Sequence, residues 1–343
     1  FEVIEKDFLA KAGQNYAASR GEFLNGKIMA AYLGYTFVDP AECVFFTEDG
    51  EFDAEKTNEA LAEKLMKLEN AVVPGFYGSL PDGKVKTFSR GGSDITGSIV
   101  ARAIHADIYE NWTDTSGVLL ADPRIVENPK TIDILTYREL RELSYMGATV
   151  LHEDAIFPVR YSKIPINIRN TNRPEDKGTF IVPQSDDISD TVITGVAGRK
   201  GFTAIFVEKD MMNSELGFGR RVLEVLEVNK INFEHLPSSI DTMCVIVKTA
   251  DLEGKREKIL DSIFRLTNPD AVVVHDGIAL LAVVGRGMVR SKGTAARVFS
   301  SLANASVNIR MIDQGSSELN IIIGVDDADY ETAICAIYNE FVK

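Results

Sequence analysis

The chain has 343 residues, of which 45% are hydrophobic and 26% are charged, so it is long enough for two or three globular domains. A formal net charge of −14 excludes a broad nucleic-acid surface, and no apolar run approaches the ~20 residues that a membrane helix needs. Three scattered cysteines and four histidines lack disulfide or metal-ligand spacing, which predicts no resident metal and a reducing, cytoplasmic location.

Helical and strand patterns alternate along the first half of the chain. Lys56–Leu68 has helical spacing, with Leu61 and Leu65 on one face. Thr136 and Glu139 have the spacing of a capping box that begins another helix. This alternation predicts an α/β domain with a mostly parallel sheet and helices on both faces, whose ligands bind beyond the carboxyl ends of the strands. The predicted helices are Lys56–Leu68, Asp94–His105 and Thr136–Met146, and the predicted strands are Val44–Thr47, Ala71–Gly75, Ile108–Thr113 and Ile164–Asn170.

A change of composition ends this first region. Residues 172–176 and 183–190 are rich in Pro, Asp and Ser and poor in apolar side chains, which predicts a domain boundary. We therefore expect the first domain over residues 1–182.

An internal repeat fills the second half of the chain. The matched positions are Gly201 and Gly277, Gly217 and Gly293, and Ile231 and Val307, and each pair is separated by 76 residues (277 − 201, 293 − 217, 307 − 231). Each copy is predicted as a strand, a glycine-led helix, two strands and a helix. The elements expected in the first copy are Phe202–Glu208, Phe218–Asn229, Ile231–Leu236, Thr242–Lys248 and Lys255–Leu266, with a further strand at Ala271–His275.

The second copy lacks a fourth strand, because its last helix, Tyr330–Phe341, is followed only by Val342 and Lys343. An open edge in so small a sheet leaves backbone groups unpaired. We expect Thr191–Ala197 to cross over and complete the second copy, so that the two copies interlock. The repeats are then predicted as domains over residues 191–276, including this crossover strand, and 277–343.

Arg90-Gly91-Gly92-Ser93-Asp94 lies between a short strand-like stretch and a helix. Two glycines allow the backbone to approach an anion, the helix start offers free N–H groups, and Arg90 can hold a carboxylate or phosphate through two hydrogen bonds. The same residues also fit a tight turn in which Ser93 is the N-cap of the helix.

Two small polar segments follow the next strand, Trp112–Val118 and Ala121–Arg124. They fit a nucleotide loop, but their composition alone favours an ordinary polar loop followed by an Asp-Pro turn. Glu22, beside a glycine, fits either an ammonium ligand or a solvated carboxylate. Trp112, the single tryptophan, is expected in the core.

Taken together, the chain resembles the aspartokinase family over nearly its whole length. The matching segments are Ser19–Glu22, Val73–Phe76, Thr87–Asp94, Trp112–Asp114, Ala121–Val126, Leu143–His152, Ile166–Thr171 and Gln314–Ile321. The resemblance implies an amino-acid-kinase fold followed by two α+β, ferredoxin-like ACT domains. It also implies transfer of the γ-phosphoryl group of ATP, with Mg²⁺, to the β-carboxylate of L-aspartate, the first step toward lysine, threonine and methionine.

The resemblance assigns roles to individual residues. Arg90 corresponds to the ligand of the aspartate carboxylate, and Glu22 lies near the aspartate amino group. Gly91, Gly92 and Ser93 shape that site, and Asp94 orients catalytic groups. The nucleotide pocket corresponds to Thr113, Asp114, Leu119, Asp122, Pro123 and Arg124.

Three departures from the family pattern bear on activity. The Lys-Phe-Gly-Gly-Ser-Ser segment that cradles the phosphates would lie upstream of Phe1, so a chain that truly began at Phe1 is expected to lack kinase activity. Leu119 stands where many members have Tyr, which predicts apolar adenine contacts. Thr149 stands where many have Lys, so that nucleotide contact is lost or passes to the backbone.

The resemblance further implies feedback inhibition by an amino acid at an ACT interface, within a homodimer. Glu234 and Asp241 offer carboxylates for a side-chain ammonium group, which favours lysine over threonine as the effector. The alternative is that both acids simply face solvent. The residues that match the effector segments are Met212, Ser214, Gly217, Phe218, Asn232, Phe233, Glu234, Ser238, Ser239 and Asp241.

Two other functions stay open from the sequence. One is another kinase of the same fold, acting on glutamate, carbamate or a nucleotide, against which the tandem repeats argue. The other is a non-catalytic amino-acid sensor, against which the intact substrate motifs argue.

Overall fold

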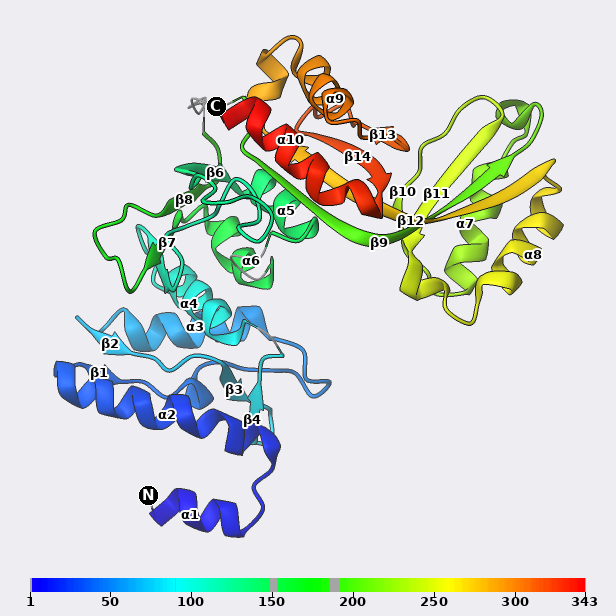
Figure 1. Ribbon diagram of the computed structural model, residues 1–343. Helices are drawn as coiled ribbons and strands as arrows, with labels where there is room; N and C mark the ends of the chain where they lie inside the picture. Colours follow the sequence, from blue (N-terminus) through cyan, green and yellow to red (C-terminus); the bar gives the residue numbers. More distant parts are fainter. Residues whose placement is uncertain (1, 90, 149–152, 186–191, 343) are drawn as a thin grey trace. The chain divides into compact units, whose positions relative to one another are not determined.

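The computed structural model describes residues 2–89, 91–148, 153–185 and 192–342 (Figure 1). It divides into two compact units. The first comprises residues 1–118, 131–144 and 149–186, and the second comprises 119–130, 145–148 and 187–343. Arg90, Thr149 and Thr191 lie outside the described residues. In the parts of the chain that the structure describes, no helix is long and apolar enough to cross a membrane.

Local sequence signals account for the helices of the first unit. Asp53 caps α3 by accepting a hydrogen bond from the Lys56 N–H at 3.1 Å, and Leu61 and Leu65 are buried on one face. The capping box at α5 is confirmed by its two reciprocal hydrogen bonds, 2.8 Å from the Thr136 N–H to Glu139 and 3.3 Å in return. The helices of this unit are α1 (Glu2–Leu9), α2 (Gln14–Leu33), α3 (Ala54–Leu65), α4 (Gly92–Ala103), α5 (Tyr137–Tyr145) and α6 (Glu153–Ser162).

The described strands of the first unit form three sheets. A four-stranded sheet has the order β5-β7-β8-β6, in which β5 with β7 and β6 with β8 are parallel and β7 with β8 is antiparallel. β1 and β2 form a parallel pair, and β3 and β4 an antiparallel pair. The strands are β1 (Thr36–Phe37), β2 (Ala71–Val72), β3 (Tyr77–Ser79), β4 (Val85–Thr87), β5 (Tyr109–Thr113), β6 (Ile134–Thr136), β7 (Ile166–Asn170) and β8 (Thr179–Val182).

Two predicted strands are shorter than expected. Val44–Thr47 contains only isolated bridges at Phe45 and Phe46. The stretch Ala71–Gly75 keeps two residues as β2, because Pro74 has no N–H to donate to a ladder.

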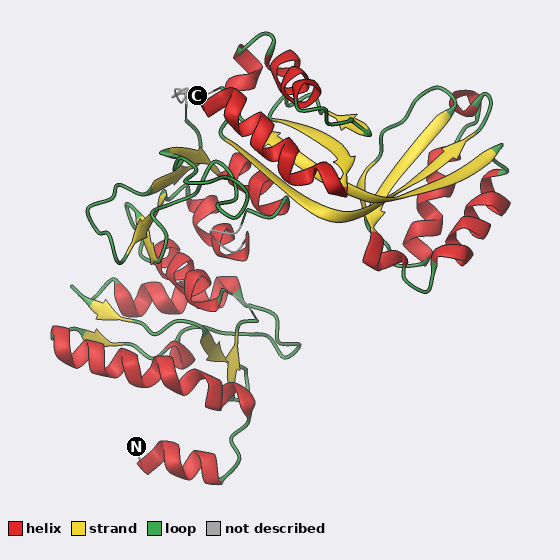
Figure 2. Cartoon of the chain, viewed as in Figure 1, coloured by secondary structure: helices red, strands yellow, loops and turns green. Residues whose placement is uncertain are grey.

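The second unit contains one six-stranded antiparallel sheet in the order β10-β11-β9-β12-β14-β13 (Figure 2). β9 and β12 are each 14 residues long and run through both repeats. The strands are β9 (Gly195–Glu208), β10 (Phe233–His235), β11 (Thr242–Lys248), β12 (Ala271–Val284), β13 (Met311–Asp313) and β14 (Asn320–Asp326). The helices are α7 (Phe218–Val228), α8 (Arg256–Thr267), α9 (Thr294–Asn304) and α10 (Tyr330–Val342).

The interlock expected at the missing strand of the second repeat is observed in the described part of that segment. Gly195–Gly198 pairs with Leu281–Val284, and Phe202–Glu208 of the same strand pairs with β11 of the first repeat. The stretches expected as separate strands, Ala271–His275 and the segment after Gly277, are one strand with an irregular register between His275 and Ile278. Each repeat therefore completes its sheet with a strand of the other.

Candidate active site and effector site

A strained loop follows β2 and lies against the start of α4. Phe76 has a φ of +82°, which costs a non-glycine residue energy, and the loop tolerates it because its neighbours hold it. The Thr96 hydroxyl accepts a hydrogen bond from the Phe76 N–H at 3.1 Å and donates one to the Gly92 carbonyl at 2.8 Å. A Cβ on Gly75 would meet the Ser93 backbone at 2.8 Å, so glycine is required for this close approach.

The helix start predicted at residues 91–94 is present. Gly91 is the N-cap of α4 with a φ of +58°, and no side chain caps the helix. The interpretation of Ser93 as the N-cap is wrong, because Ser93 is exposed and lies inside the first turn. The first N–H groups of α4 are thus left without a side-chain cap, as an anion site requires. Arg90 precedes this turn and lies outside the described residues.

Asp94 is anchored by two residues of β5. The Asn111 side-chain amide donates to Asp94 Oδ1 at 2.9 Å and to the Tyr109 hydroxyl at 2.9 Å. The Tyr109 hydroxyl donates to the Asp94 carbonyl at 3.1 Å. Asn111 is 8% exposed, and burial raises the pKa of Tyr109 to about 12. Asn111 and Tyr109 were not predicted as site residues, although their alternate positions on a strand were a usable signal.

Glu22 lies half-buried on α2, one turn before Gly26. Gly26 packs against Pro74 so closely that a Cβ there would lie 2.5 Å from the proline ring. Residues four apart share a helix face, so Glu22 faces the same β2 loop that contacts α4. The loop after β2 therefore contacts Gly26 of α2 and both Gly92 and Ser93 of α4, and Glu22 lies one turn before Gly26.

Arg20, also missed from the sequence, lies one turn after Tyr16 on the same helix and is 9% exposed. Its guanidinium lies 4.2 Å from the centre of the Tyr16 ring and 4.4 Å from that of Phe23, and it donates to the Ser19 hydroxyl at 2.9 Å. Stacking on aromatic faces lets a buried guanidinium avoid full desolvation. The guanidinium also lies 5.6 Å from the centre of the Tyr77 ring, so Arg20 links α2 to β3.

The first part of the predicted nucleotide loop follows the carboxyl end of β5. Thr113 is half-buried and its hydroxyl lies 3.2 Å from Asp114, which is exposed. Ser116 connects this loop to the one after β7, because it donates to Asp176 at 2.6 Å and accepts from Asn170 at 2.9 Å. The loops at the ends of two parallel neighbours are therefore joined, at the edge where such sheets bind ligands.

The second part of the predicted nucleotide loop belongs to the other unit. Leu119 is half-buried and Pro123 is exposed. Asp122 accepts from the Arg124 N–H at 2.8 Å and from its guanidinium at 2.6 Å. This hydrogen bond from Arg124 holds the pKa of Asp122 below its usual range. Arg124 has a side chain that is 83% exposed, so it remains accessible to a ligand.

The second repeat holds this 119–130 loop through its last helix, α10. The Tyr338 hydroxyl accepts a hydrogen bond from the Lys130 N–H at 2.9 Å, and Cys335 lies 3.4 Å from the Ile125 carbonyl. At the start of the loop, the Leu120 carbonyl accepts from the Val196 N–H at 2.7 Å.

The predicted effector residues fall into two groups. The first surrounds the turn after β9, where Asp241 accepts from the Met211 N–H at 2.9 Å and the Ile240 carbonyl accepts from the Asn213 N–H at 3.1 Å. Gly217, with a φ of +78°, begins α7 directly after this turn. The members of this group are Met212, Ser214, Gly217, Phe218, Ser238, Ser239 and Asp241.

The second group, Asn232, Phe233 and Glu234, lies at the other end of β11, because Phe233 pairs with Val247 and the turn adjoins Thr242. Five residues of strand separate the groups, which is roughly 17 Å at 3.4 Å per residue. Glu234 does not face solvent. Its carboxylate lies 3.4 Å from the Lys248 ammonium and accepts from the Tyr145 hydroxyl.

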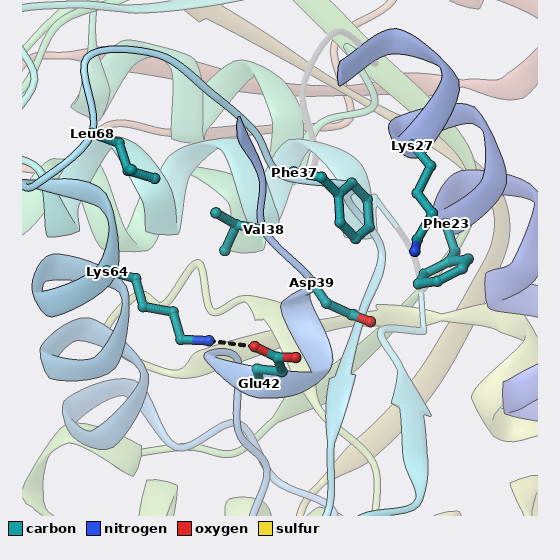
Figure 3. Close-up of a pocket in the computed structure, with 8 residues that line it drawn as sticks. All are labelled: Phe23, Lys27, Phe37, Val38, Asp39, Glu42, Lys64 and Leu68. Carbon is teal, nitrogen blue, oxygen red and sulfur yellow. Dashed lines mark hydrogen bonds and ion pairs between the residues drawn. The ribbon is translucent and has the colours of Figure 1, made fainter. Parts of the chain in front are cut away.

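A pocket of about 430 Å³ in the first unit contains none of the predicted site residues (Figure 3). The Lys64 ammonium pairs with Glu42 at 2.5 Å on one side. On the other side, the Lys27 ammonium lies 4.9 Å from the centre of the Phe23 ring. The residues that line this pocket are Phe23, Lys27, Phe37, Val38, Asp39, Glu42, Lys64 and Leu68.

Comparison with known proteins identifies the family. The chain matches the amino acid kinase family over residues 2–170 and the ACT domain over residues 281–341. It is 41% identical over 330 residues to aspartokinase 3 of Bacillus subtilis, covering 94% of this chain and 72% of that protein. The chain belongs to the aspartokinase family. The assignment accounts for the kinase-type fold of the first unit and the ACT fold of the second.

Solved structures agree with this assignment. The aspartate kinase of Clostridium acetobutylicum is 54% identical, with a TM-score of 0.91 over 99% of this chain and 78% of that one. Aspartokinase III of E. coli with aspartate and ADP has a TM-score of 0.73 at 25% identity, over 96% of this chain and 76% of that one. The same enzyme with lysine and aspartate has a TM-score of 0.70 at 26% identity, over 95% of this chain and 74% of that one. The aspartokinase fold predicted from the sequence is confirmed.

Proposed function

We propose that this aspartokinase transfers the γ-phosphoryl group of ATP to the β-carboxylate of L-aspartate, giving 4-phospho-L-aspartate for lysine, threonine and methionine biosynthesis. The observation that carries the proposal is the uncapped start of α4, which lies against the strained Phe76 loop beside the anchored Asp94. Free N–H groups at a helix start bind a carboxylate. The E. coli relative solved with aspartate and ADP supports the same pair of ligands.

In this proposal the aspartate lies between α2 and α4. Arg90 holds a substrate carboxylate, Glu22 receives its ammonium group, and the Gly91–Ser93 turn supplies backbone N–H groups. Asp94 orients the reacting groups. Phosphoryl transfer asks the protein mainly to position its reactants and neutralise charge, and these residue types do both.

The nucleotide is proposed to bind as its Mg²⁺ complex. No cluster of three or more His, Cys, Asp or Glu side chains that could hold a metal is found in the described ranges, so the ion is expected to arrive on the ATP phosphates. Thr113 and Asp114 would contact it from one loop. Leu119, Asp122, Pro123 and Arg124 would contact it from the other.

Feedback regulation by L-lysine is proposed for the ACT repeats, over residues 191–276 and 277–343. Asp241 is the acid that remains for a lysine ammonium, since Glu234 already contacts Lys248. The two effector groups lie at opposite ends of β11, so a second copy in a homodimer is proposed to bring them together. The E. coli relative solved with lysine supports the choice of effector.

A coupled assay of the intact enzyme with aspartate and glutamate tests the proposed reaction. We expect ATP turnover with aspartate and a kcat/KM with glutamate that is lower by at least about tenfold, because one extra methylene in a fitted site costs roughly 1–3 kcal/mol of transition-state binding. Equal turnover of both acids, or binding of aspartate without turnover, would show that the proposal is wrong.

A further inference from the structure

The strand β5 places two side chains against the start of α4. Tyr109 and Asn111 are two residues apart on the strand, so they share a face, and Thr113 follows on the same face at the nucleotide end. The Tyr109 ring lies so close to the helix that a Cβ on Gly97 would approach its hydroxyl to 2.7 Å. The helix can lie this close to the strand only because residue 97 is glycine.

The hydrogen bonds between these elements form a closed set. The Asn111 amide has two hydrogens, and one points to Asp94 Oδ1 while the other points to the Tyr109 hydroxyl, both at 2.9 Å. The Tyr109 hydroxyl uses its own hydrogen for the Asp94 carbonyl. Both the side chain and the backbone of Asp94 are therefore fixed by neutral donors.

The chemistry of these donors keeps the set in one arrangement. Burial raises the pKa of Tyr109 to about 12, so its phenol keeps its proton at any physiological pH. Asn111 carries no charge, and its bond to the carboxylate is charge-assisted. Among the described residues, Asp94 Oδ2 has no hydrogen-bond partner. The network therefore holds the carboxylate through Oδ1 and leaves Oδ2 available to a reacting group.

We infer that Asn111 and Tyr109 are positioning residues that hold the Asp94 carboxylate in one orientation for phosphoryl transfer. The inference rests on the proposed function, because it deepens the role proposed for Asp94. A reaction that depends on placement loses rate when a supporting hydrogen bond is removed, even though that bond never touches substrate.

A double-mutant cycle on the intact enzyme tests this inference. We expect Asn111→Leu to lower kcat roughly tenfold, with the KM for aspartate changed less than about twofold. Tyr109→Phe, which keeps the ring packed on Gly97, should lower kcat about threefold. In an Asp94→Ala background, Asn111→Leu should have no further effect, because its action passes through the lost carboxylate.

A matched control separates positioning from stability. Asn167 is 4% exposed on the neighbouring strand β7 and, among the described residues, has no hydrogen bond to Asp94, so Asn167→Leu removes a buried strand amide without touching the network. It should leave kcat within about twofold of wild type. Thermal unfolding of all variants identifies any that fail to fold, in which case the mild Tyr109→Phe carries the test.

Each outcome decides one of the two claims. Equal losses of kcat in Asn111→Leu and Asn167→Leu, or additive losses with Asp94→Ala, would overturn the inference and leave the proposed function intact. Wild-type kcat in Asp94→Ala would instead overturn the proposed role of Asp94. A strong loss in Asp94→Ala that Asn111→Leu does not deepen supports both.

Discussion

The two ACT repeats share one fold but use it differently. Both begin their first helix at a left-handed glycine, with φ of +78° at Gly217 and +86° at Gly293. In the first repeat this turn is open, and Leu216 beside it is 97% exposed. In the second repeat, α10 binds the 119–130 loop through Tyr338 and Cys335. The same architecture thus presents a candidate effector turn in one copy and supports a candidate nucleotide loop in the other.

The two repeats nevertheless share one sheet. Its two central strands, β9 and β12, run through both copies, so a substitution in the core of one copy lies close to the core of the other. The comparison predicts that damage to either core destabilises the protein similarly. Only the functional consequence should differ between the halves.

The largest expected effect comes from the cores themselves. Ile205 and Leu281 occupy equivalent positions, 76 residues apart, and are 1% and 0% exposed. Ile205→Ala and Leu281→Ala should each lower the free energy of unfolding by about 2–5 kcal/mol, measured by urea denaturation, because each leaves a cavity in a packed sheet. At urea concentrations where both variants remain folded, Ile205→Ala should weaken lysine binding and Leu281→Ala should raise the KM for ATP. The reverse assignment would contradict the division of roles.

The next effect concerns the charge at the effector turn. Asp241→Asn keeps an oxygen acceptor for the Met211 N–H but removes the carboxylate charge. We expect the Kd for lysine, measured by calorimetry, to rise roughly tenfold because a charge-assisted contact is lost. Asp261→Asn, on the exposed face of α8, is the matched control and should leave lysine affinity unchanged. Binding of threonine with no lysine signal would refute the proposed effector.

Local signals made much of the fold predictable. The capping box at Thr136 and Glu139 involves residues three apart, and Thr242–Lys248 has the bounds expected from its alternation. The prediction that one strand ends before Gly277 and another begins after it was wrong. Gly277, with a left-handed φ of +71°, makes the register of β12 irregular but does not end the strand. A glycine in a strand pattern does not distinguish these two outcomes.

The site was less predictable, because its contacts are tertiary. Asp94 and Asn111 are 17 residues apart, and nothing local links them. Trp112 was expected in the core but is 44% exposed, since the Arg169 guanidinium lies 4.5 Å from the centre of its ring and supplies the partner that burial would otherwise give. Glu234 was expected either to bind an effector or to face solvent; its carboxylate lies 3.4 Å from the Lys248 ammonium and is largely buried, which contradicts only the solvent-facing alternative.

A smaller effect is expected from the support that α10 gives to the nucleotide loop. Tyr338→Phe removes the hydroxyl that accepts from the Lys130 N–H. The Lys130 amide should then exchange its hydrogen faster, and the KM for ATP should rise about threefold, since one neutral hydrogen bond is lost. Tyr137→Phe removes a buried hydroxyl contact to the Ile164 carbonyl elsewhere and is the control. A change in lysine affinity rather than in the KM for ATP would mean that the second repeat does not serve this loop.

The smallest expected effect is the pH dependence of the Asp122–Arg124 pair. The hydrogen bond from Arg124 lowers the pKa of Asp122 in the folded protein, so this pair stabilises the fold above the unfolded pKa, and the contribution disappears as pH falls through the folded pKa. The Arg124 side chain is exposed, so solvent screening keeps the contribution of this ion pair to stability small. Arg124→Gln should therefore shift the melting temperature by less than about 2 °C at pH 7, and the difference from wild type should shrink as the pH falls through the folded pKa of Asp122. A difference that grows toward low pH would show that Arg124 is not the group that lowers the pKa of Asp122, and that this ion pair does not stabilise the loop.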